Sequence, residues 1–173
     1  VLMGTISKQF MSLPKEVLST AMKVHQKYFS LIDDNNKLVP KFIFVSNSIP
    51  SKKRDITITD GNQRVLKARL SDASFFWNSD ASKTIEYWQE KLKDILFYDG
   101  LGSLHEKTIR MSKISNNFST LFSIDKEVAE EAILLSKFDL ASEIVSEFPT
   151  LQGIMGGYYS KLKNKPAVIS KAI

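Results

Sequence analysis

Residues 127–157, EVAEEAILLSKFDLASEIVSEFPTLQGIMGG, decide the fold because they predict two helices separated by a short break. Val128, Ala132 and Leu135 are spaced four and three residues apart, so they share one face of the first helix. The next position on that face is Asp139. Because an unpaired buried carboxylate is costly, the sequence predicts that Asp139 is paired, caps a neighbouring helix or has a function.

The second helix of this stretch begins near Pro149, which suits a first helical turn because no intrahelical partner is available for an N–H there. Gly153, Gly156 and Gly157 follow, and the lack of a side chain lets another backbone or a ligand approach closely. A helical corner in which Asp139 caps a neighbouring helix explains this pattern without a ligand. We expect Asp139 to be mostly buried and hydrogen-bonded.

The chain before residue 80 predicts a small module of mixed structure. A helix opens at Leu13-Pro14-Lys15-Glu16, with proline and glutamate in its first turn, and runs to about residue 26. The turn-forming run Asp33-Asp34-Asn35-Asn36 separates two apolar segments, which predicts a β-hairpin over residues 28–46. Residues 42–45 are apolar at every position, so we expect a central strand covered on both faces, with Phe42 and Phe44, or else Ile43 and Val45, in the core.

The rest of the module is predicted as a loop and a helix. Residues 47–59 are polar and include the basic run 52–54, which predicts a surface loop that could touch phosphate. A long helix is predicted over 60–77, with Arg64, Lys67 and Ser71 on its exposed side.

The polar residues 79–83 predict a domain boundary, after which the pattern is helical throughout. Helices are predicted over 85–96, over 104–122, from Asp125 as an N-cap, and after Pro166. The expected fold class is α+β and mostly helical, with a small hairpin-containing module over residues 1–80 and an all-helical domain over 81–173.

Composition sets outer limits on the function. The net charge of +5 lies in residues 1–80, with 12 Lys+Arg against 7 Asp+Glu, while residues 81–173 carry 12 of each sign. This admits an anionic partner such as nucleic acid, although an ordinary lysine-rich surface is the slightly favoured explanation of so small an excess. There are no cysteines, which is compatible with the cytoplasmic location that we expect, and there is no apolar run of about 20 residues, so no membrane span is expected. The sequence lacks an initiator Met, and we expect a segment of a longer protein.

Motifs for catalysis are missing from the sequence. No phosphate-binding loop follows a strand, and the only histidines are His25 and His105, too few for a zinc site with three histidine ligands. On these grounds we expect a non-catalytic binding or scaffold module, with no metal or cofactor in this segment.

Six ordered motifs resemble one protein family. They are HQKYF at 25–29, KFIFVSN at 41–47, GNQRVLKARLSDASFF at 61–76, LGSLHEKTIR at 101–110, LLSKFDL at 134–140 and EFPTLQGIMG at 147–156. Together they cover almost the whole chain and resemble the middle of the β subunit of the bacterial two-subunit glycyl-tRNA synthetase.

The resemblance implies an α2β2 glycine–tRNA ligase that attaches glycine to tRNA-Gly with ATP and Mg²⁺. The α subunit of that family carries the aminoacylation site and uses the ATP and Mg²⁺, and the β subunit mainly recognises tRNA. Residues 1–80 would be the end of a module similar to the B3/B4 region of phenylalanyl-tRNA synthetase. Residues 81–173 would be the truncated start of a domain similar to HD phosphohydrolases.

The sequence departs from working HD enzymes, which bind metal around a His-Asp doublet. No such doublet occurs here, and Asp139 alone cannot hold a catalytic metal. We therefore interpret the second domain as a former hydrolase reused for tRNA binding, with Asp139 as a structural carboxylate.

The expected tRNA contacts are cationic side chains on two helices. Arg64 and Lys67 are three residues apart on one helix, and Lys107 and Arg110 repeat this spacing on another, with Lys113 one turn further on. Weaker candidates, which could instead pair with carboxylates, are Arg69 and Lys137. Two alternatives remain: a structural module that docks the α subunit, and, less favoured, an HD-type phosphohydrolase.

Overall fold

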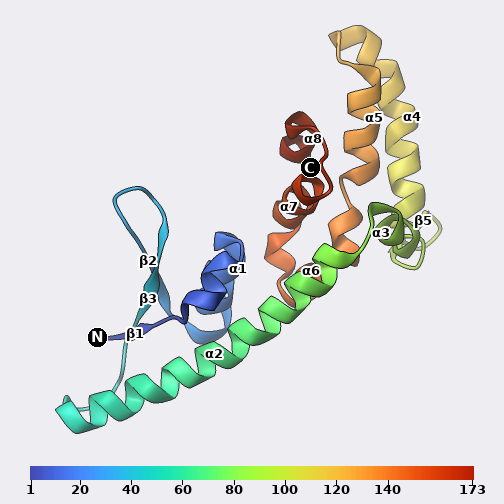
Figure 1. The fold of residues 1–173 in the computed structure, drawn as a ribbon. Helices are drawn as coiled ribbons and strands as arrows, with labels where there is room; N and C mark the ends of the chain where they lie inside the picture. The colour runs from blue at the N-terminus through green and yellow to red at the C-terminus, as the bar shows by residue number, and fades with distance from the viewer. The chain divides into compact units, whose positions relative to one another are not determined.

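The structure, a computed structural model, describes the backbone of residues 1–173 and every side chain except those at positions 116, 119 and 120. The chain divides into two compact units, Val1–Trp77 and Asn78–Ile173. It is mostly helical with small antiparallel sheets, so the α+β class that the sequence predicts is confirmed (Figure 1). The assignment of the units to the B3/B4-like and HD-like families stays a prediction.

The first unit combines a three-stranded sheet, short helical segments and most of a long helix. Its elements are β1 (Leu2–Thr5), η1 (Lys8–Ser12), α1 (Lys15–Thr20), the π-helical segment η2 (Ala21–His25), β2 (Phe29–Ile32), β3 (Leu38–Phe44) and α2 (Lys52–Ser82). The last residues of α2, from Asn78, belong to the second unit.

The strand order is β1-β3-β2, and both pairs are antiparallel. The hairpin and the central position of β3 are therefore confirmed. The turn forms because Asp33 Oδ1 accepts from the backbone N–H groups of Asn35 and Lys37, each at 2.9 Å. Asn36 follows in the left-handed conformation, with φ of 57°, which asparagine tolerates.

One face of β3 makes the core of the first unit. Phe42 is fully buried and stacks on Tyr28, with ring centroids 4.8 Å apart, and Phe44 is also buried. On the opposite face Ile43 is half-buried and Val45 is 69% exposed. The prediction that both faces of this strand are covered is thus wrong within the first unit, since an apolar run does not say which of its faces has a partner.

The bounds predicted for the long helix are also wrong. α2 begins at Lys52, so most of the predicted loop is helical, and it continues to Ser82 through the predicted boundary region. The Asp55 N–H donates to Ser51 O at 2.8 Å, and Asp55 places an acidic side chain in the first turn, which favours a helix start. Gly61 lies inside this helix, and no atom lies within 4 Å of the position that a Cβ would take there.

The second unit is built from short helices around a helical hairpin. Its elements are α3 (Ile85–Lys91), β4 (Leu96–Tyr98), β5 (Gly102–Ser103), α4 (Leu104–Phe122), α5 (Lys126–Leu135), η3 (Phe138–Ala141), α6 (Glu143–Glu147), η4 (Pro149–Leu151), α7 (Ile154–Leu162) and α8 (Ala167–Ala172). α4 and α5 lie side by side, and α7 contacts α8 (Figure 1).

An aromatic cluster lies at the centre of this unit. Trp88 packs against Tyr159 and Phe138, with ring centroids 4.9 and 5.3 Å away, and all three side chains are fully buried. The predicted start of the last helix after Pro166 is confirmed, and so is the Asp125 N-cap, which accepts from Glu127 N at 3.0 Å.

The helix predicted over 85–96 ends earlier, at Lys91, and Leu96–Tyr98 forms β4, which pairs with β5. The second part of the chain is therefore not helical throughout. Gly100 and Gly102 both have φ of 76°, a conformation that glycine adopts without strain, and this allows the tight turn between β4 and β5.

Candidate functional site

Asp139 is fully buried and caps the start of α7. Its Oδ2 accepts from Gly153 N at 2.6 Å and from Gly156 N at 2.9 Å, which satisfies two of the N–H groups that a helix leaves free at its start. Burial raises the pKa of the Asp139 carboxyl above its ordinary value, and the two glycine N–H groups oppose this rise. The prediction that Asp139 is buried and hydrogen-bonded is confirmed.

The geometry differs from the predicted helical stripe. α5 ends at Leu135, and Asp139 lies in the separate 3₁₀ segment η3, so it does not continue the face of Val128 and Ala132. Asp139 is buried because the chain turns back on itself here. The predicted close approach at the glycines is also found, since a Cβ at Gly157 would lie 2.8 Å from the Ser170 carbonyl oxygen of α8.

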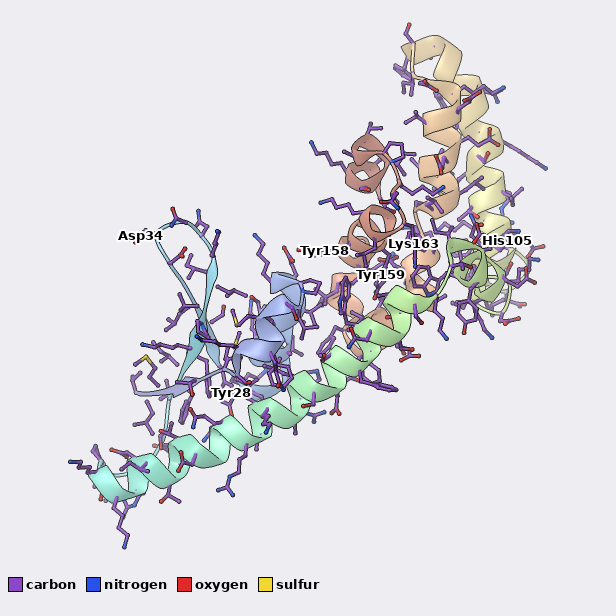
Figure 2. The ribbon with its side chains drawn as sticks, viewed as in Figure 1. Tyr28, Asp34, His105, Tyr158, Tyr159 and Lys163 are labelled. Atoms are coloured by element: carbon purple, nitrogen blue, oxygen red, sulfur yellow. The ribbon has the colours of Figure 1, made fainter. Side chains whose placement is uncertain are left out.

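Asp80, in the last turn of α2, is a second buried carboxylate with a matching role. Its two oxygens accept from Glu143 N and Ile144 N, each at 3.0 Å, at the start of α6. Tyr159, which Figure 2 labels, also donates its hydroxyl to Asp80 Oδ2 at 2.8 Å. Burial first, and then the Asp80 charge, raise the pKa of the Tyr159 hydroxyl far above its ordinary value, so Tyr159 remains a donor.

Sequence reasoning missed Asp80, although the signal was present. Asp80 follows Leu66, Leu70 and Ala73 at helical spacing, and these three are buried along one face of α2. Extending that face past residue 77 would have marked Asp80 as buried. Its contacts with backbone N–H groups, like those of Asp139, are made at helix starts, so both carboxylates act as caps.

The described side chains form no cluster that could hold a metal ion. No set of three or more His, Cys, Asp or Glu residues in this part of the chain is placed to hold a metal ion. His105 is half-buried in the first turn of α4, and His25 ends η2 in the other unit. The described residues therefore give no support to the HD-type phosphohydrolase alternative.

The predicted tRNA-binding cations of α2 are accessible. Arg64, Lys67 and Arg69 are exposed, and none of them takes part in the ion pairs found among the described residues. Arg64 donates its Nε to the Asp60 carbonyl oxygen at 3.4 Å, a long contact that leaves the rest of the guanidinium available. The basic run Lys52–Arg54 forms the exposed first turn of the same helix.

The predicted tRNA-binding cations of α4 differ from one another in exposure. Arg110 and Lys113 are exposed, but Lys107 is half-buried with its Nζ 3.8 Å from the Phe97 ring centroid, a cation–π contact. Lys137 is half-buried and its charge acts on the nearby Asp139, which agrees with its status as a weaker candidate. Arg64, Lys67 and Arg69 belong to the first unit, and Lys107, Arg110, Lys113 and Lys137 belong to the second.

Comparisons with known proteins identify what the chain is similar to. The family model described as glycyl-tRNA synthetase beta subunit matches residues 1–173. The chain is 46% identical over 173 residues to the glycine–tRNA ligase β subunit of Coxiella burnetii, an alignment that covers 100% of this chain and 25% of that protein. It is 45% identical over 173 residues to the same subunit of Rickettsia bellii, with the same coverage, and 42% identical over 174 residues to that of Lawsonia intracellularis, covering 99% and 25%.

The chain thus spans about a quarter of the length of these curated relatives. In the described residues, no helix has both the length and the apolar character that crossing a membrane requires.

Proposed function

Because the chain belongs to the glycyl-tRNA synthetase β subunit family, we propose that it is a tRNA-binding segment of a two-subunit glycine–tRNA ligase. The relatives are named as β subunits of glycine–tRNA ligase, an enzyme whose substrate is a tRNA. In this proposal the chain binds tRNA-Gly in the cytoplasm, within an α2β2 enzyme whose α subunit uses ATP and Mg²⁺. The first unit acts as a B3/B4-like module and the second as an HD-like domain.

The observation that carries the proposal is the pair Arg64 and Lys67 on α2. Both are exposed, they lie three residues apart on one helix face, and no carboxylate forms an ion pair with either among the described residues. Such charges suit the phosphate backbone of RNA, where each cation displaces condensed counterions and positions the nucleic acid without reading its bases. Arg110 and Lys113 offer the same chemistry on α4.

The test replaces Arg64, Lys67, Lys107 and Arg110 with Gln, singly and together, in the intact α2β2 enzyme. We expect weaker binding of tRNA-Gly and a slope of log affinity against log salt that is shallower by about 1 for each phosphate that is no longer neutralised. Glycyl-adenylate formation should change little. Because Lys107 is held over Phe97, we expect its single variant to have the smallest effect of the four.

A matched control replaces four exposed lysines at other places, Lys8, Lys23, Lys126 and Lys171, with Gln. This changes the net charge by the same amount. Equal decreases in affinity for the two fourfold variants would show that overall charge, and not these positions, attracts tRNA. An unaltered affinity and salt slope for the first variant would reject the proposal. Failure of α2β2 assembly would favour the alternative, a module that docks the α subunit.

We also propose that this chain has no aminoacylation chemistry of its own. It has no phosphate-binding loop, and the two carboxylates buried with the aromatic cluster of the second unit, Asp80 and Asp139, are engaged by backbone N–H groups. The purified chain without α subunit should not catalyse glycine-dependent exchange between ATP and pyrophosphate. Robust exchange by a preparation free of α subunit would contradict this.

A further inference from the structure

The end of the α4–α5 hairpin presents a cluster of exposed apolar side chains. We define this tip cluster by five residues whose exposed fractions lie between 49% and 72%: Ile114, Phe118, Leu121, Phe122 and Ile124. The first four are on α4 and the last is in the loop that leads to α5. In Figure 1 this loop extends beyond the other helices of the second unit.

The spacing of the cluster is that of a helix-packing face. Phe118, Leu121 and Phe122 follow Ile114 by four, seven and eight residues, which places them on one side of α4. The Phe118 and Phe122 rings also stack on each other, with centroids 6.1 Å apart and planes 20° apart. The first half of α4 is packed, with Leu104 and Thr108 buried, but about half or more of each apolar side chain on this face of its second half is exposed.

The charge of the segment limits what can cover it. No residue from 114 to 124 is charged, so nothing in this segment can neutralise a phosphate. An exposed apolar patch without charge typically marks a contact with another apolar protein surface. The tip cluster therefore differs in kind from the cationic positions assigned to tRNA above.

The area of the cluster argues against a separate subunit as the occupant. The exposed parts of five such side chains offer on the order of 500 Å², whereas a stable interface between separate proteins buries roughly 800 Å² on each partner. A segment of the same polypeptide needs less area because its effective concentration is already high. The relatives are about four times as long as this chain, so their β subunits contain ample polypeptide outside the matched region.

We propose that the tip cluster is an intramolecular docking surface, covered by an uncharged apolar helix face from the part of the β subunit outside these 173 residues. This rests on the proposed function only in placing the chain within a longer β subunit. It does not depend on tRNA binding.

The experiment measures cysteine labelling in the full-length β subunit. These 173 residues contain no cysteine, so Leu121→Cys and, in a second protein, Ile124→Cys each introduce one thiol here. The proteins react with a water-soluble maleimide, and peptide mass spectrometry identifies labelling at the introduced site. The same protein unfolded in urea gives the rate for full exposure. Isolated β subunit, α2β2 enzyme and α2β2 enzyme with tRNA-Gly are compared.

We expect labelling at both positions to be at least about tenfold slower than in urea already in the isolated β subunit. Circular dichroism checks that each variant is folded, and agreement between the two positions excludes an effect of one substitution. Fast labelling that slows only with the α subunit would overturn the proposal in favour of that subunit. Slowing only with tRNA would overturn it in favour of RNA, and fast labelling throughout would show an uncovered surface. The tRNA affinity of the same preparations is measured separately, so failure of the tRNA-binding proposal leaves this result readable.

Discussion

The two units of the chain are stabilised in different ways. All the buried polar or charged side chains found among the described residues lie in the second unit: Asp80, Thr108, Ser112, Asp139, Ser142, Ser160 and Ser170. The buried side chains of the first unit belong to the apolar class, among them Phe10, Val17, Leu18, Phe42 and Leu66. Its partly buried side-chain hydrogen bonds include the one from the Tyr28 hydroxyl to Asn62 Oδ1.

The starts of short helices account for three of these seven buried polar side chains, Asp80, Asp139 and Ser142. The first unit contains most of α2, which has 31 residues, so most of its backbone groups form hydrogen bonds within the helix. In contrast, α6, α7 and α8 have 5, 9 and 6 residues. Every helix start leaves about four N–H groups without a partner, and in short helices these groups are most of the backbone. In the core of the second unit, Asp80, Asp139 and Ser142 supply buried acceptors for such N–H groups.

The largest effect is expected in the apolar core of the first unit. Replacing Phe42 with Ala removes a fully buried ring that packs against Tyr28 and Phe44, and should lower the free energy of unfolding by about 3–5 kcal/mol. Urea unfolding of the chain measures this. Val45→Ala, on the exposed face of the same segment, is the matched control and should change it by less than about 0.5 kcal/mol. Equal midpoints for both variants would show that β3 is not the core strand.

In the second unit the corresponding change is the removal of an acceptor. Asp80→Ala leaves the N–H groups of Glu143 and Ile144 and the Tyr159 hydroxyl without their acceptor, which should cost about 2–4 kcal/mol. Urea unfolding again measures the cost. Asp72→Ala, at an exposed position of the same helix, should change the free energy of unfolding by less than about 0.5 kcal/mol. A small cost for Asp80→Ala would mean that water can replace the carboxylate, so that the two units would not differ as described.

Features of the fold that depend on neighbouring residues could be predicted from the sequence. The hairpin followed from a turn run between apolar segments, and the Asp125 cap followed from its place before an amphipathic helix. The start of α2 at Lys52 was missed because polar composition was taken as a loop, although Pro50, Ser51 and Asp55 have the positions typical of a helix start.

The non-local contacts could not be predicted. Nothing near Asp80 in the sequence indicates that its acceptors serve Glu143, more than sixty residues away. Asp139 was predicted as buried from a helical face that ends at Leu135, so the conclusion was confirmed but its geometry was not. The predicted cations and their tRNA contacts stay predictions, because exposure alone does not identify a partner.

Asp139 allows a test of the buried carboxylate by pH. Asp139→Ala should cost about 1–3 kcal/mol through unpaired N–H groups at Gly153 and Gly156, whereas Asp139→Asn keeps an acceptor and should cost less. Burial raises the native pKa of Asp139, so between its ordinary and its raised value the native state binds more protons than the unfolded state. The stability that this group contributes is therefore complete in acid and falls as the pH rises through the native pKa.

The Asn variant does not titrate at this position, so the stability of the wild type minus that of the variant should fall as the pH rises from the ordinary Asp pKa of about 3.9 towards the raised native pKa. Urea unfolding of both proteins across this range gives the difference directly. A difference that grows with pH would mean that the glycine N–H groups outweigh burial and that the charged form is the stabilised one.

The smallest effect is expected at Asp125, which has the same task as Asp139 at an exposed position. Its Oδ1 accepts from Glu127 N at 3.0 Å and Val128 N at 3.2 Å at the start of α5. Asp125→Ala should cost about 1 kcal/mol, because water can reach the freed N–H groups and replace part of the missing hydrogen bonding. Urea unfolding of Asp125→Ala, with Asp125→Asn as the control that keeps the cap, measures this. If Asp125→Ala cost as much as Asp80→Ala, burial would not set the difference in cost between an exposed and a buried cap.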